Sequence, residues 1–312
     1  DDPVYNTKTQ GLIFHILRFL YNSMPPEMNR PGKSSSEDDT NLTGVRLLAL
    51  RTLTSLTHDN ELAAQQMTAC HNFCDQGSSI DFDGDDDEDA ESTSSSSVRG
   101  INVLAKLIFE LETEPIRSNE KASGSAATVR NSRGDEELHR YDSTIFCLNT
   151  LANIIEASDV RRLLAEITVP TASGDQELWI QWLCKWLVQQ TEGFRDAILS
   201  IGREEAGSQE SERELEKNEE EKLLAAGNSC VLLACLMMEP DEVPEEPEST
   251  SIIRKIIVEQ MPLDKGGKST GVTMLINTLK AFCNFYHFSL GELSLAIVGP
   301  VKKLIDGLQE LK

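Results

Sequence analysis

Long hydrophobic runs and an excess of positive charge are both missing from this sequence of 312 residues. No apolar stretch approaches the roughly 18 residues that a membrane-spanning helix needs, so we expect no membrane span. No leader with a charged start and an apolar middle opens the chain. Lys and Arg number 29 against 52 Asp and Glu, which gives a formal net charge of −23. Because nucleic-acid-binding surfaces usually carry a basic excess, we expect no direct contact with nucleic acid.

The acidic charge is confined to local segments. The stretches 81–91, 203–222 and 239–248 carry formal charges of −8, −5 and −6, which is −19 of the −23. The remainder of the chain is close to neutral. The acidity is therefore typical of solvated segments, and the body of the protein is neither strongly acidic nor basic.

A disulfide framework is also missing. The seven cysteines are odd in number and irregularly spaced, which favours a reducing compartment. Most of them stand on apolar helical stripes, where we expect small buried hydrophobic side chains. These are Cys147, Cys184, Cys230, Cys235 and Cys283.

Two short motifs resemble ligand-binding loops but lack their defining residues. Residues 266–269 (GGKS) match the end of a phosphate-binding loop, yet Pro262 stands where the first glycine is required. The acidic run that starts at Asp81 suggests a calcium loop, but Asp86 and Ser92 occupy the positions of the required glycine and bidentate acid. We interpret both segments as flexible, solvated loops.

Metal and nucleophile motifs are missing as well. Cys70, His71 and Cys74 supply three ligands where a structural zinc site needs four, and we interpret Cys70 and Cys74 as one face of a helix ending near Phe73. The five histidines form no zinc-protease motif, and no serine or cysteine stands in a nucleophile motif. The sequence therefore predicts no catalytic residue, metal, cofactor or small-molecule substrate, so we expect a protein that is not an enzyme.

Helical periodicity dominates what is present. Apolar residues recur at the spacing of one helix face, and alternating strand patterns are not found, so the predicted fold class is all-α. The predicted helices cover 10–23, 42–57, 60–74, 98–111, 141–156, 159–167, 176–190, 211–238, 251–260, 270–288 and 290–311. Between them, stretches rich in Ser, Gly, Asp and Glu predict mobile loops at 30–40, 75–97, 117–137, 203–210 and 239–250.

Three of the predicted helices share a threonine-leucine core followed by a polar turn. The core occurs in 50–56, 148–154 and 276–282, and a second helix follows each turn. Such helix pairs cannot bury their apolar stripes alone and stack into α-solenoids. The uneven spacing predicts one elongated domain over 1–312, an α-solenoid of divergent HEAT-like repeats with long acidic and serine-rich inter-helix loops. Because the chain starts at Asp1 rather than Met, we expect it to be a piece of a longer protein.

Aromatic residues are few, but all three tryptophans fall in one predicted helix. Trp179, Trp182 and Trp186 are three and four residues apart and share one helix face. This spacing favours packing between neighbouring repeats. The alternative is an exposed aromatic strip that binds a partner, since Trp is enriched at binding hot spots.

The polar turn 58–61 is the first candidate binding site. Either Asp59 or Asn60 can accept from the free N–H groups of the following helix, and Glu61 suits its positive end. The binding residues that we predict here are His58, Asp59, Asn60 and Glu61, and a purely structural capping role is the alternative. A second candidate group is Lys280, Lys302 and Lys303, for which the alternative is an ordinary solvated helix face.

Several of these segments resemble the C-terminal domain of the wings apart-like (WAPL) family of cohesin-release factors. The string Leu-Thr-His-Asp-Asn-Glu within 50–61 is the most specific similarity. The helices at 147–156, 225–236 and 274–282 resemble the family's repeats in order and character, and the likeness spans most of 42–311.

The resemblance implies a nuclear, chromatin-associated protein that acts in sister chromatid cohesion. It would bind cohesin subunits (the SMC ATPase heads, the kleisin and the HEAT-repeat regulatory subunits), open the ring and hydrolyse nothing itself. A generic armadillo or HEAT adaptor in transport, binding a different protein ligand, is the main alternative. Such adaptors spread Trp and Asn over many repeats, whereas this chain clusters its Trp. An enzyme with a cryptic site is the third possibility.

Overall fold

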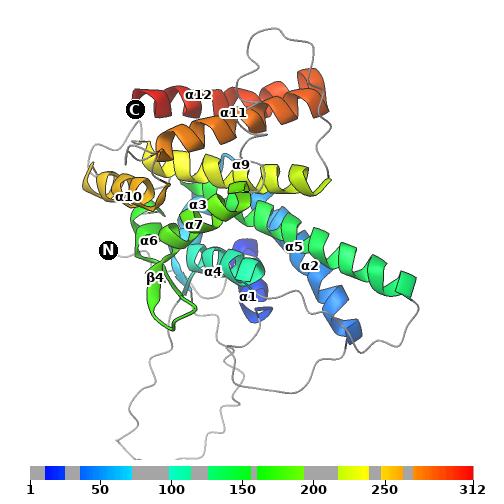
Figure 1. The fold of residues 1–312 in the computed structure, drawn as a ribbon. Helices are drawn as coiled ribbons and strands as arrows, with labels where there is room; N and C mark the ends of the chain where they lie inside the picture. Colours follow the sequence, from blue (N-terminus) through cyan, green and yellow to red (C-terminus); the bar gives the residue numbers. More distant parts are fainter. Residues whose placement is uncertain are drawn as a thin grey trace, which may run out of the picture.

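The computed structural model describes residues 11–24, 36–71, 98–113, 126–155, 160–192, 217–238, 247–262 and 270–311. Of these residues, 84% are α-helical, which confirms the all-α prediction (Figure 1). The helices are α1 (Leu12–Asn22), α2 (Ser36–Thr57), α3 (Glu61–Thr68), α4 (Gly100–Thr113), α5 (Ala126–Ile154), α6 (Val160–Glu166), α7 (Trp179–Glu192), α9 (Lys217–Met237), α10 (Pro247–Gln260), α11 (Gly271–Leu290), the 3₁₀ turn η1 (Gly291–Ser294) and α12 (Leu295–Glu310).

Two short antiparallel hairpins interrupt the helices. In the first, β1 (Cys70–His71) pairs with β2 (Val98–Arg99), and in the second, β3 (Thr168–Pro170) pairs with β4 (Gln176–Leu178). The predicted helices 60–74, 98–111 and 176–190 are therefore wrong at these ends, and Cys70 does not lie on a helix face. Strands of two or three residues are too short to produce a recognisable alternation of apolar and polar residues.

One row of long helices runs through the molecule in chain order. Helix α2 packs on α5, α5 packs on α9, and α9 packs on α11, and Figure 1 shows these four crossing from the lower right to the top. Other helices cover the row: α4 packs on α5, α7 and α10 pack on α9, and α12 packs on α11. A continuous hydrophobic core runs from α1 to α12 as a result.

The shared threonine-leucine core lies inside this row. Its leucines, Leu53, Leu151 and Leu279, are completely buried in α2, α5 and α11. Burial of each such side chain contributes about 1.5–3 kcal/mol. The repeated sequence pattern thus marks three of the four helices of the row, of which α2 and α5 pack side by side and α11 is separated from α5 by α9.

Buried threonines make polar contacts between neighbours in the row. Thr150 of α5 is fully buried, and its Oγ1 lies 2.8 Å from Oγ1 of Thr54 in α2. Thr278 of α11 shares a side-chain hydrogen bond with Cys230 of α9. Thr150 and Thr278 occupy the same position of the shared threonine-leucine core, and each faces the preceding helix of the row.

Helices α2, α5 and α10 begin earlier than the sequence predicted. They include residues 36–40, 126–137 and 247–250, so the predicted loops 30–40, 117–137 and 239–250 are wrong at their C-terminal ends. Once a packed stretch has nucleated a helix, adding polar residues costs little, and Pro247 suits a first helical position. The remainder of these loops, and those at 75–97 and 203–210, lie outside the described residues.

Arginines from neighbouring helices bind the carbonyl ends of α1 and α9. Arg46 of α2 donates to the backbone carbonyl of Ser23 just after α1. Arg161 of α6, although buried, donates to the carbonyls of Cys235 and Met238. Arg254 of α10 donates to the carbonyl of Met237 at 2.8 Å. Cationic groups are favourable at helix C-termini, where free carbonyls concentrate negative charge.

Candidate functional site

The predicted turn between α2 and α3 is a capped, exposed helix connection. Asn60 is the N-cap of α3, and its Oδ1 accepts from the backbone N–H of Ala63 at 3.1 Å. Asp59 has a φ of 51°, the left-handed conformation that Asp tolerates better than most residues. The prediction left Asp59 and Asn60 open as the cap, and the structure assigns that role to Asn60.

The charged side chains of this turn project into solvent. The side chains of His58 and Asp59 are 70% and 92% exposed, and His58 Nε2 lies 3.6 Å from Asp59 Oδ2. Glu61, also exposed, stands in the first turn of α3, where its charge favours the positive helix end. These three side chains are accessible to a partner, whereas the fourth, Asn60, already has a structural role.

Contacts with α5 hold the turn in place. Asn153 of α5 donates from Nδ2 to the backbone carbonyl of Thr54 at 3.1 Å. The buried hydroxyl of Thr57, the last residue of α2, donates to the carbonyl of Leu53 at 3.0 Å. The turn therefore extends from a helix end that is fixed to the neighbouring helix of the row.

The predicted lysines lie on the last helix pair, in a different part of the row. Lys302 and Lys303 are exposed on α12, and Lys280 is partly buried on α11. Burial raises the pKa of the Cys283 thiol in α11, and Lys302 partly offsets this rise, so the lysine lies near α11. Helices α2 and α3 pack on α1, α4 and α5, whereas α11 and α12 pack on α9 and on each other. The two candidate groups thus belong to opposite ends of the helix row.

The tryptophans belong to the core, as the favoured interpretation predicted. Trp179, Trp182 and Trp186 are all buried, so the exposed aromatic strip is ruled out. Trp186 donates from Nε1 to the Glu112 carboxylate of α4 at 3.1 Å, and Thr144 of α5 donates to the other oxygen at 2.7 Å. One carboxylate thereby links α4, α5 and α7.

The thiols described by the structure also fit the core interpretation. Cys147, Cys184, Cys230 and Cys283 are buried and Cys235 is partly buried, and none of these five described cysteines forms a disulfide. Burial raises the pKa of Cys184 to about 12 and raises the pKa values of Cys147 and Cys230 as well. A nucleophilic cysteine needs the opposite shift, so these thiols behave as small hydrophobic groups.

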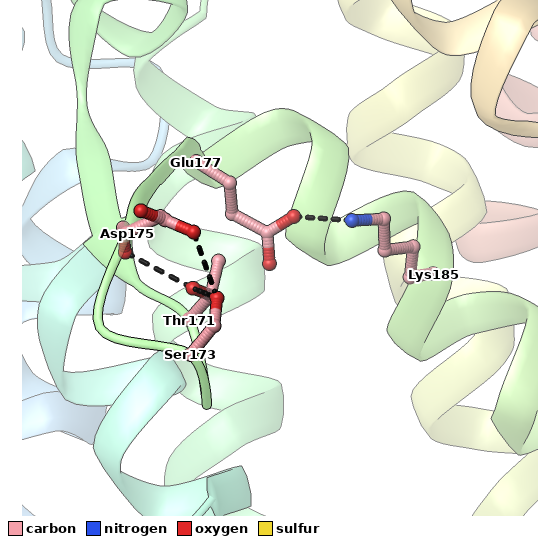
Figure 2. A network of polar contacts seen from close by, with 5 residues as sticks. All are labelled: Thr171, Ser173, Asp175, Glu177 and Lys185. Carbon is pink, nitrogen blue, oxygen red and sulfur yellow. Dashed lines mark hydrogen bonds and ion pairs between the residues drawn. The ribbon is translucent and has the colours of Figure 1, made fainter.

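A polar network that the sequence did not predict closes the second hairpin (Figure 2). Between β3 and β4, the hydroxyls of Thr171 and Ser173 lie 2.9 Å apart, and Ser173 donates to the Asp175 carboxylate at 2.9 Å. Gly174 adopts a φ of 88°, which glycine accommodates without strain. Lys185 of α7 forms an ion pair with Glu177 of β4. These contacts fix the hairpin on α7, and the network has a structural explanation.

An exposed apolar corner between α11 and α12 was also missed. Phe288, Leu290, Leu293 and Leu295 all have large exposed side chains. The predicted helix 290–311 treated this stretch as the beginning of one amphipathic helix. Apolar residues on both sides of a glycine, in the string FSLGELSL, are the signal that could have revealed the corner.

The rejected ligand motifs are only partly covered by the structure. Among the described residues, no group of three or more His, Cys, Asp or Glu is arranged to hold a metal ion. The acidic run 81–92, residues 266–269 and Cys74 lie outside the described residues. No helix in the described part of the chain has the length and apolar character needed to cross a membrane.

The chain matches no protein-family model, no curated protein and no solved structure.

Proposed function

We propose that this chain is a non-catalytic scaffold that binds other proteins through an α-solenoid of divergent HEAT-like repeats. The observation that carries the proposal is the row formed by α2, α5, α9 and α11, covered by α4, α7, α10 and α12. Neighbours in the row are joined at equivalent positions by Thr150 and Thr278. Solenoids stack similar helix pairs in chain order and offer extended surfaces to their partners.

The partner that we propose is cohesin, on the basis of the sequence resemblance. The string 56–61 carries the most specific part of that resemblance. It runs from the end of α2, where Asn153 of α5 donates to the Thr57 hydroxyl, into the exposed turn before α3. The scaffold would act in the nucleus by binding cohesin subunits and favouring the open state of the ring. A protein without catalytic groups can shift such an equilibrium only by binding one state more tightly than the other.

The direct test is retention of purified cohesin subcomplexes by the immobilised chain. The proposal predicts retention of at least one subcomplex containing the SMC heads, the kleisin or a HEAT-repeat regulatory subunit. The cohesin proposal is wrong if the folded chain retains none of them.

Variants of the turn can separate binding from capping. The triple variant His58→Ala, Asp59→Asn, Glu61→Gln keeps the Asn60 cap and a residue that tolerates the left-handed conformation. We expect it to weaken retention by about tenfold, because charged contacts at an interface contribute energies of this order. It should lower the Tm less than loss of the cap does, because only the favourable charge of Glu61 at the start of α3 is removed. The matched control is Asn60→Ala, which removes the cap, keeps the His58, Asp59 and Glu61 side chains and should lower the Tm instead. Undiminished retention by the triple variant would move the binding site away from this turn.

The lysine group is tested in the same assay. The double variant Lys302→Glu, Lys303→Glu changes only exposed positions of α12. If the lysines contact cohesin, this variant should retain less cohesin than the parent chain. Its retention should also fall less steeply as the salt concentration rises, because fewer ion pairs remain to be screened. If the variant retains as much cohesin as the parent chain, the two lysines do not contact cohesin and belong to an ordinary solvated helix face.

A further inference from the structure

The second hairpin is a sheet of two strands, β3 and β4, on a helical body, and Figure 1 shows it extending below α6. A two-stranded sheet has two edges, and each edge presents backbone N–H and C=O groups with which another strand can pair. Hydrogen bonds within the tip and the ion pair between Glu177 and Lys185 hold the hairpin in place. A strand that joins it therefore does not have to order it first.

The hydrogen bonds at the two ends of the hairpin show which backbone groups point outward. Thr171 donates from its N–H to the carbonyl of Asp175 at one end, and Trp179 donates to the carbonyl of Ile167 at the other, both at 2.8 Å. In an antiparallel ladder, residue pairs joined by hydrogen bonds alternate with pairs that are not joined. The outward-pointing groups therefore belong to the first and last residues of each three-residue strand.

A proline closes one of these two edges. The last residue of β3 is Pro170, which has no N–H to donate. On β4 the outward groups are the N–H and carbonyl of Gln176 and the N–H of Leu178, because the carbonyl of Leu178 serves the first turn of α7. Among the described residues, no acceptor is found for these two N–H groups. Buried N–H groups almost always have a partner, so both face solvent and form the open edge of β4.

An unpaired acid lies beside this open edge. Within 163–184 the chain has three acidic residues and no Lys or Arg. Two of them, Glu166 and Glu177, form ion pairs with basic residues on either side of this segment. The third, Asp175, is exposed, and its carboxylate has no basic partner among the described residues. Asp175 directly precedes Gln176, so a basic side chain is favoured in a strand that joins the edge.

The register argues against a second copy of this chain as that strand. Two β4 strands that paired through their open edges would lie antiparallel, with Gln176 of one copy opposite Leu178 of the other. The two Glu177 residues would then lie directly opposite each other, and like charges in that position are destabilising. Each copy also carries a formal net charge of −23. An extended basic segment of a different protein avoids both problems.

We propose that the open edge of β4 pairs with an extended, basic segment of a protein partner, which adds a third strand to the hairpin. In this mode of recognition, backbone hydrogen bonds to Gln176 and Leu178 supply the affinity, and a lysine or arginine of the segment lies beside Asp175. The inference rests on the proposed scaffold function and names one of its binding surfaces. It does not depend on cohesin being the partner.

Solution NMR of the full chain with a designed peptide tests the inference. The probe is a peptide of about seven residues that alternates lysine with valine, which favours an extended strand. At saturation it should shift the amide signals of Gln176 and Leu178 and slow their exchange with solvent by about tenfold. The amides of Val169 and Glu177 are already bonded within the hairpin, so their exchange should change less.

Two comparison peptides separate backbone pairing from charge. The first has glutamate in place of lysine, and the second keeps the lysines but carries a methyl group on every backbone nitrogen. Both should bind at least about tenfold more weakly than the probe, the first because of charge and the second because it cannot pair with a strand. Because the second comparison uses the parent chain, it does not depend on the folding of any variant.

Three variants of the chain locate the contact. Gln176→Pro removes the outward N–H of β4 and should weaken binding of the probe by about tenfold, while the bonds between β3 and β4 remain, as they do beside Pro170. The matched control is Thr168→Pro, which removes the outward N–H of the opposite edge and should bind like the parent chain. Asp175→Asn can still accept from Ser173 and should reduce the preference for the lysine peptide over the glutamate peptide.

The inference is wrong if the probe leaves the amides of Gln176 and Leu178 unchanged. Equal binding of the methylated peptide would show capture by charge alone, and equal losses in Gln176→Pro and Thr168→Pro would place the contact away from the open edge. Dimers that Gln176→Pro abolishes would make a second copy the occupant. Cohesin retained by a chain that does not bind the probe would contradict the open edge and leave the scaffold proposal standing.

Discussion

The α2–α3 turn and the α11–α12 corner both connect two helices in a few residues, but they do so with opposite chemistry. In the first, Asn60 caps α3 with its side chain and the exposed residues 58–61 are all polar, although Leu62 directly after them is exposed as well. In the second, Gly291 permits the reversal and the neighbouring exposed residues are apolar. Exposure of polar side chains costs nothing, so it says little about binding. Exposure of large apolar side chains is unfavourable in water, and it therefore points more directly to a partner.

The largest effects test whether the two connections rest on equally well packed helices. Leu53 precedes the first connection and Leu279 precedes the second, and both are completely buried. Each substitution, Leu53→Ala or Leu279→Ala, should destabilise the protein by about 3 kcal/mol, because each leaves a cavity in the core. Urea denaturation of the two variants measures this. A loss below about 1 kcal/mol at either site would show that one end of the row is loosely packed.

The next largest effect concerns the backbone of the corner. Gly291→Ala places a side chain at a φ of 54° and a ψ of −128°, which should cost about 1–3 kcal/mol. The corresponding change at the turn, Asp59→Gly, removes a side chain from a left-handed residue and should be neutral or slightly stabilising. Thermal melts of both variants provide the comparison. Equal losses would mean that the two connections depend on backbone conformation to the same degree.

A smaller effect is expected from the cap of α3. Asn60→Ala removes the acceptor of the Ala63 N–H and should cost about 1 kcal/mol, whereas Asn60→Asp should retain most of the stability. Denaturant titration distinguishes the two variants. If both variants are equally stable, packing rather than the Asn60 cap stabilises the start of α3.

The smallest effect is expected where apolar side chains already face water. Leu293→Ser should change the free energy of unfolding by no more than about 0.5 kcal/mol, because the side chain is mostly exposed in the folded state. The variant should bind hydrophobic dyes less than the parent chain does, because Leu293 is the most exposed leucine of the corner. A stability loss above about 1 kcal/mol would show that Leu293 packs within the fold.

Periodicity predicted that the helices exist, though not all of their ends, and it favoured a buried tryptophan face on α7. Trp179, Trp182 and Trp186 recur at helical spacing beside Leu183 and Leu187, and the structure buries all five side chains. The repeated threonine-leucine core likewise identified three helices of the row, α2, α5 and α11, but not α9, which lies between the last two. These features depend on regular spacing, which a sequence displays directly.

Features set by single backbone angles were not predictable in the same way. Asp59 and Asn60 both have side chains suited to capping, and only the left-handed φ of Asp59 leaves Asn60 in the N-cap position. The corner was missed because a helical pattern over 290–311 fits the apolar residues equally well. The 3₁₀ turn from Gly291 to Ser294 changes the direction of the chain, and the leading apolar residues then face solvent.

The arginines at the end of α9 have a consequence for local opening. Arg161 and Arg254 come from α6 and α10, and both bind carbonyls between Cys235 and Met238. The last turn of α9 therefore cannot fray without releasing contacts to two other helices. In hydrogen exchange, amides in that turn should open together with those of α6 and α10 as one cooperative unit, rather than individually as at an ordinary helix end. A ligand that held α10 in place would then slow exchange in α6, across the end of a helix that it does not touch.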